Sequence, residues 1–239
     1  MNEFAQSIRG AIELIVHADA VLVRTVALSL AVSGTACLWA AAFGLVGGAW
    51  LAVARFPGLR AALLLLNTLL ALPSVVAGLA VYLLLSRSGP LGSWGILFTP
   101  AAMVVAQTIL VLPVVAALAR QLVADSMRDA GETLRSMGAG PLLSALLVLV
   151  DERRAVVTVL LTAFGRAIAE VGAVMIVGGN IDGVTRVMTT AIALETSKGD
   201  LPLALALGLV LLGIVALLNL AIAALPRGVA SVAVLAPAR

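Results

Sequence analysis

Long runs of apolar residues, separated by shorter polar connections, dominate the chain between residues 21 and 225. Five runs stand out, at residues 21–53, 60–85, 97–118, 155–177 and 201–225. A helix needs about 20 apolar residues to cross a hydrocarbon layer roughly 30 Å thick. A core helix of a soluble protein would instead carry polar residues along one face. The pattern therefore predicts an all-α integral membrane protein with about five transmembrane helices.

The N-terminal segment, residues 1–20, has a different pattern. Apolar residues recur there at helical spacing, but charged residues interrupt them at Glu3, Arg9 and Glu13. This favours a surface or interfacial helix over a sixth span. No cleaved signal peptide is recognisable before the first run, so we expect that run to direct insertion. Inside the second and third runs, Pro73 and Pro113 predict local kinks.

Composition supports a membrane protein, because 62% of the residues are apolar and only 11% are charged. The net charge of +3 is spread between the runs, so we expect no nucleic-acid partner. Nine of the 15 Lys and Arg residues fall on one side of the membrane: in the first and third connections and the tail, residues 226–239. Five fall on the other side. The positive-inside rule then predicts an external N-terminus and a cytoplasmic C-terminus.

The third connection, residues 121–154, is the longest polar segment. Asp129 and Glu132 are expected to open a helical stretch, which Gly138 and Pro141 should end before a second helix begins. A short helix presented beyond the membrane would suit docking into a groove of a partner protein. A solvated connecting loop is the alternative.

Two ionisable residues, Arg166 and Glu170, lie inside the fourth run. Four positions apart on a helix, they share one face and can form an ion pair. Because burying a single charge in a membrane is costly, the pair should face the protein interior. One interpretation is a pair that fixes helix packing. The other is a functional site in which Arg166 supplies positive potential for an anion while Glu170 restrains it or takes part in gating, with Gln107 and Thr108 as further polar groups.

A polar segment before the last run, residues 178–200, should cap the outer face. Its charged residues are candidates for docking an external partner protein, although exposed charges are usually just solvated: Asp182, Arg186, Glu195 and Lys198.

The sequence offers little evidence that this protein is an enzyme. The only histidine is His17 and the only cysteine is Cys37, and no metal-ligand cluster or nucleophile with a base is visible. The only lysine, Lys198, is not part of a phosphate-binding glycine loop, so we expect this chain not to hydrolyse ATP. We predict no catalytic residue, no metal site and no cofactor bound by this chain.

The third connection resembles the cytoplasmic signature of type I ABC importer permeases, which begins Glu-Ala-Ala and continues to a glycine. Glu132 falls on its glutamate and Gly138 on its glycine. Thr133 and Leu134 replace the two alanines, and Asp151 replaces a later proline. In that family this loop is the coupling helix that inserts into the ATPase subunit. The resemblance implies a coupling role for four residues: Asp129, Glu132, Gly138 and Ala139.

Four further segments resemble the tungstate-specific branch of the molybdate, tungstate and sulfate permeases. They are RFPG at residues 55–58, LLSRSGPLG at 84–92, FGRAIAEVGAVMIVGGN at 164–180 and TRVMTTAIALETSKGD at 185–200. The resemblance covers nearly all of residues 21–225, and implies that this range is one ABC type I transmembrane domain.

Membership of that family implies a homodimer in a prokaryotic plasma (inner) membrane. Its partners would be membrane lipid, two ABC ATPase subunits that use ATP and Mg, and an extracytoplasmic oxyanion-binding protein. The implied function is ATP-driven import of an oxyanion, most plausibly tungstate, with a molybdate or sulfate permease as the alternative. From a different class, an ion-coupled secondary carrier with Glu170 as coupling carboxylate, or a channel, also stays open.

Overall fold

The structure is a computed structural model that describes residues 3–225 of the chain, and within this range it is helical without strands. The predicted all-α class is therefore confirmed for these residues. The α-helices are α1 (Glu3–Val16), α2 (Ala20–Val53), α3 (Leu59–Leu70), α4 (Ser74–Leu85), α5 (Pro100–Ser136), α6 (Pro141–Asp151), α7 (Arg153–Ile168), α8 (Gly172–Gly178), α9 (Met188–Lys198) and α10 (Leu201–Ala224), and a 3₁₀ turn η1 (Gly92–Trp94) follows α4. The predicted tail, with Arg227 and Arg239, lies outside the described residues.

Three helices are long and apolar enough to cross a membrane on their own: α2, α5 and α10, with 34, 37 and 24 residues. Two bent pairs can each form one more span. The α3–α4 pair bends by 102° and the α7–α8 pair by 58°. These five segments match the five apolar runs, so the predicted number of crossings agrees with the structure if each bent pair is one span. The 14-residue helix α1 packs against α10 beside Pro202, and its predicted surface location stays a prediction.

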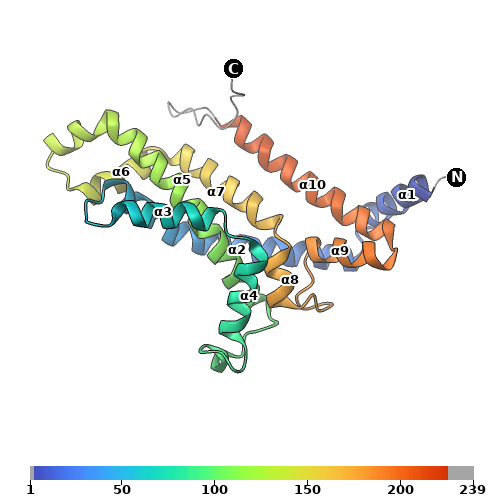
Figure 1. Ribbon diagram of the computed structural model, residues 1–239. Coiled ribbons are helices and arrows are strands. Elements are labelled where there is room, and N and C mark those ends of the chain that lie inside the picture. The colour runs from blue at the N-terminus through green and yellow to red at the C-terminus, as the bar shows by residue number, and fades with distance from the viewer. Residues whose placement is uncertain (1–2, 226–239) are drawn as a thin grey trace, which may run out of the picture.

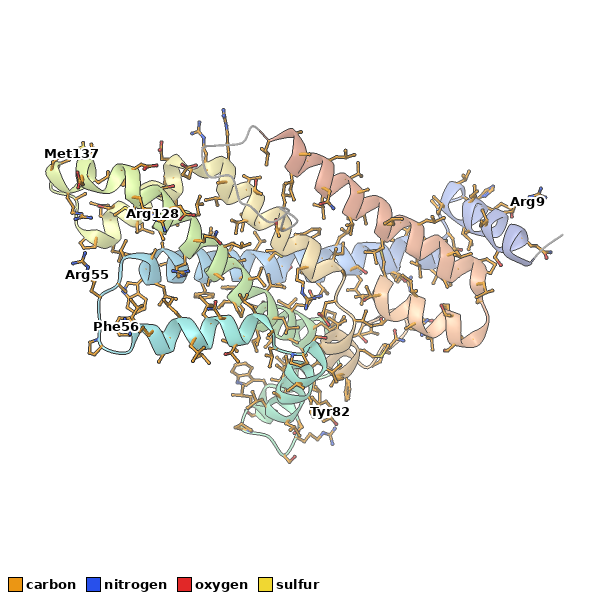
Figure 2. All side chains as sticks on the ribbon, turned by 45° about the horizontal axis from the view of Figure 1, so that its top comes forward. Arg9, Arg55, Phe56, Tyr82, Arg128 and Met137 are labelled. Atoms are coloured by element: carbon orange, nitrogen blue, oxygen red, sulfur yellow. The ribbon has the colours of Figure 1, made fainter. Side chains whose placement is uncertain are left out.

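The centre of the fold is the packing of α2 along α5 (Figure 1). Val32 shares a cluster with Met103, and further along both helices Gly48 meets Ala119, so the two helices run in the same direction. The α3–α4 pair between them therefore returns the chain from the end of α2 toward the level at which α5 begins. Arg55, Arg128 and Met137 consequently lie at one end of the molecule and Arg9 at the other (Figure 2).

The bend between α3 and α4 lies at Pro73, as the sequence predicts. Proline lacks the N–H that would continue the helical hydrogen bonds. In contrast, α5 continues through Pro113 without ending. Beyond the two bends, α4 packs against α8 (Figure 1). A Cβ atom on Gly78 would lie only 2.7 Å from Ala173 Cα, so glycine permits this close approach.

One prediction for the third connection is wrong in detail. No new helix opens at Asp129, because α5 runs without interruption from the membrane to Ser136. The residues after the apolar run contain no proline, and their only glycine before the turn, Gly131, is buried inside the helix. The predicted turn is confirmed: Gly138 has φ +84°, which favours glycine, and α6 begins at Pro141. A helix–turn–helix is therefore the observed form.

Candidate functional site

The ion pair predicted inside the fourth run is present at the bend between α7 and α8. Arg166 lies in the last turn of α7, and its Nη1 donates to Glu170 Oε2 at 2.9 Å. Glu170 follows the end of that helix. Its side chain is only 5% exposed, whereas that of Arg166 is 50% exposed. The carboxylate is therefore held inside the fold while the guanidinium reaches its edge.

Glu170 has partners on two further helices. The backbone N–H of Ala173 in α8 donates to Glu170 Oε1 at 3.4 Å, and the Ser74 hydroxyl at the start of α4 is another hydrogen-bond partner of the carboxylate. The backbone carbonyl of Glu170 accepts from Thr189 Oγ1 at 2.7 Å. Sequence analysis missed these three residues. Pro73 predicted a break in the second run, but nothing in the sequence placed that break beside Glu170.

Gln107 completes one side of this region. Its side chain is buried, and its Nε2 donates to the Ala167 carbonyl at 3.0 Å. Its Oε1 is buried and has no hydrogen-bond partner among residues 3–225. Gln107, Arg166 and Glu170 line the same small recess, together with Leu110, Val111 and Ala167. Three of the four predicted pathway residues thus meet at one place.

Thr108 is the fourth, and the structure places it elsewhere. Its hydroxyl donates to the Val104 carbonyl at 2.7 Å and lies 3.5 Å from the Ala36 carbonyl of α2. These contacts belong to the packing of α5 against α2, and Thr108 does not line the recess.

The four predicted docking charges form one connected network. Arg186 Nη1 lies 3.2 Å from Asp182 and 3.9 Å from Glu195, and Lys198 Nζ lies 3.0 Å from the same Glu195 carboxylate. Arg186 and Glu195 are 15% and 8% exposed, and the outer two residues are 73% and 52% exposed. The inner pair therefore lies mostly buried between α8 and α10, and of the four residues only Asp182 and Lys198 are exposed.

The predicted coupling residues lie at the far end of α5 and in the turn after it. Asp129, Glu132 and Gly138 are exposed, and Ala139 is partly buried. Met137 beside them is 77% exposed and stands at the tip of the molecule (Figure 2). Behind this tip, α6 packs on α2 and α5 through the buried cluster Ala49, Val123, Ala145 and Val148. The tip is thus a firmly supported projection.

Within residues 3–225, no group of three or more His, Cys, Asp and Glu residues lies close enough together to hold a metal ion. Cys37 is buried in the packing of α2 against α5 and α7. Arg166 and Glu170, whose side chains contact each other and groups on neighbouring helices, are therefore the candidate site.

Comparisons with known proteins place the chain among transporters. It is 42% identical over 212 residues to the tungstate uptake system permease protein TupB of Peptoclostridium acidaminophilum, covering 89% of this chain and 93% of that protein. It is 43% identical over 199 residues to a probable anion ABC transporter permease of Haloferax volcanii, covering 81% and 86%. The TupB protein of Campylobacter jejuni is 44% identical over 156 residues, 65% of each chain.

More distant relatives are named as sulfate transport permeases, at 28–33% identity. No protein-family model matches the chain. The coverage by the first two relatives extends over nearly the whole described fold. Together with the five apolar segments, the comparisons show that this chain is a multi-pass membrane protein that belongs to the oxyanion permease family of ABC transporters, within its tungstate uptake branch.

Proposed function

We propose that this chain forms the membrane pathway of a tungstate importer driven by ATP. The tungstate-named relatives match at 42–44% identity and the sulfate-named relatives at 28–33%, which favours tungstate over sulfate. Molybdate has the same tetrahedral dianion chemistry and is the second candidate substrate.

The observation that carries this proposal is the half-exposed Arg166 at a bend in a membrane span. A dianion that leaves water loses its hydration and needs hydrogen-bond donors and positive charge in return. A guanidinium provides both, with up to five N–H donors. The bend leaves backbone groups of Ala167 and Glu170 outside regular helical bonding, and such non-helical backbone is tolerated at membrane depth where it is buried or lines a pathway.

The complete transporter, in this proposal, contains two copies of the chain in a prokaryotic inner membrane, with the N-terminus outside. Two ATPase subunits bind ATP and Mg on the cytoplasmic side and receive the tip formed by Asp129, Glu132, Gly138 and Ala139. An oxyanion-binding protein docks outside, near Asp182 and Lys198. Support comes from the family, from the projection of the tip, and from the cations gathered at the same end as the tip.

The test is reconstitution of the chain in lipid with its ATPase and binding protein. We expect ATP hydrolysis to rise with tungstate-loaded binding protein, less with molybdate, and not with sulfate or without an anion. Glu132→Ala and Gly138→Ala should reduce this stimulation, the latter because alanine disfavours a positive φ. Glu13→Ala, an exposed carboxylate on α1, is the matched control. Oxyanion transport that needs no ATP would refute the proposal and favour a secondary carrier.

A further inference from the structure

The donors around the Glu170 carboxylate come from three separate helices. Arg166 Nη1 reaches it from α7 at 2.9 Å, the Ala173 N–H from α8 at 3.4 Å, and the Ser74 hydroxyl from α4. A guanidinium, a backbone N–H and a hydroxyl together are the donor set that proteins use for oxyanions. Here an internal carboxylate, 5% exposed, takes all three.

The approach of α4 is built into the backbone. A Cβ atom on Gly172 would lie 2.8 Å from Ser74 Oγ and 2.9 Å from Val75 Cγ2. A glycine at this position therefore lets Ser74 and Val75 approach the bend without a shift of their side chains. The donor set depends on this contact between two helices that lie about a hundred residues apart in the sequence.

The recess also contains a buried acceptor, the side-chain oxygen of Gln107, with no hydrogen-bond donor among the described residues. Gln107 Oε1 is buried without a donor, while the Nε2 atom of the same amide is fixed on the Ala167 carbonyl. An unfilled carbonyl oxygen does not attract an anion, but it is a ready acceptor for a guanidinium. Arg166 lines the same recess and gives only Nη1 to Glu170. Its remaining N–H groups can bond Gln107 when the guanidinium turns away from the carboxylate.

We propose that the Glu170 carboxylate occupies an oxyanion-binding site in place of the substrate. The transported oxyanion then displaces this carboxylate from Arg166, Ser74 and the Ala173 N–H. This inference rests on the proposed function and names the site within that pathway. Without substrate the pair is neutral and the donors are satisfied. Because the carboxylate is tethered beside the donors, a monovalent anion such as chloride competes with it poorly. A tetrahedral dianion carries more charge and more acceptor oxygens, so it competes better.

The inference makes a prediction that distinguishes it from a packing ion pair. Removal of either partner of a packing pair damages the site in the same direction. Removal of a resident carboxylate should instead expose the donors, so the two charge variants should act in opposite directions on oxyanion binding. A charge-assisted hydrogen bond corresponds to an affinity change of about tenfold or more.

The experiment measures equilibrium binding of radiolabelled tungstate to the assembled permease–ATPase complex in lipid nanodiscs, without binding protein. Glu170→Gln should strengthen binding by about tenfold or more, Arg166→Gln should weaken it, and Arg166→Gln added to Glu170→Gln should abolish the gain. Ser74→Ala in the same background should weaken binding about threefold to tenfold, and keeps the test available if the arginine variant fails to assemble. Glu13→Gln removes an exposed charge and should change nothing.

Two results would overturn the inference. The first is that Glu170→Gln leaves tungstate binding unchanged, or that adding Ser74→Ala to Glu170→Gln makes no further difference. Either outcome would show that these donors bind no oxyanion. If the wild-type complex still responds to tungstate-loaded binding protein, the proposed function survives this failure. If no oxyanion stimulates the wild-type complex, both the proposed function and the inference fall together.

Discussion

The close packing of α2 on α5 depends on Gly48, and replacing this glycine by alanine should destabilise the fold. The added Cβ would overlap the Ala116 carbonyl oxygen and lie 2.9 Å from Ala119 Cβ and 3.0 Å from Arg120 N. An ordinary Cβ contact is 3.4–4 Å, so the helices must separate by at least about half an ångström. The obstacles are backbone atoms and a Cβ, which cannot rotate away. Overpacking of this kind costs about 1–3 kcal/mol.

Gly47 is the matched control, because a Cβ atom there would meet nothing within 4 Å. Both substitutions gain the same helix propensity, about 1 kcal/mol relative to glycine, so their difference isolates the clash. A chain of this size loses roughly 2–4 °C in Tm per kcal/mol. We expect the Tm of Gly48→Ala in detergent to fall below that of Gly47→Ala by roughly 2–12 °C. Equal Tm values for the two variants would refute the assigned contact.

Two further predictions concern buried polar contacts around α9. Ser29 Oγ accepts the first backbone N–H of α9 at 2.7 Å, so Ser29→Ala should cost about 1–3 kcal/mol and lower the Tm. Thr35→Ala, which removes an exposed hydroxyl bonded within its own helix, should leave it nearly unchanged. Glu195→Ala withdraws the buried partner of Arg186 and should cost on the order of 2 kcal/mol in the same assay. Asp182→Ala, at the exposed end of the network, should cost less than 1 kcal/mol, and a larger loss there than at Glu195 would contradict the assigned burial.

The long-range half of the candidate site was beyond prediction from the sequence. The spacing of Arg166 and Glu170 predicts their ion pair, because residues four apart on a helix face the same way. Nothing local indicates that Ser74 approaches Glu170, since that contact depends on how two bent spans pack. The pairing of Arg186 with Glu195 was also not predicted, because Arg186 precedes α9 and its spacing from Glu195 within that helix is not a helical one.

The transmembrane segments were predictable because each had to satisfy a length set by the bilayer. Pro73 marked one bend through its missing N–H. The bend before Gly172 has no proline, and the helix beyond it packs against α4, a tertiary contact that local sequence does not reveal. The apolar run that contains Pro113 ends near residue 118, but α5 continues to Ser136. Hydrophobicity indicates which residues can lie in the bilayer, whereas the length of the helix depends on the helix propensity of the residues that follow.

The continuity of α5 makes it a lever. Gly48 of α2 touches it at Ala119, about 18 Å along the helix from Gln107 and about 26 Å from Ser136, at 1.5 Å per residue. Because α2 packs along α5 from Met103 to Ala119, the part of α5 that carries Gln107 is held against α2, while the part beyond Ala119 leads to the exposed turn at Met137. Pro113 lies between Ala119 and Gln107, where its missing backbone N–H removes one helical hydrogen bond. A displacement of the exposed turn would therefore reach the recess through one continuous helix, without passing through a loop.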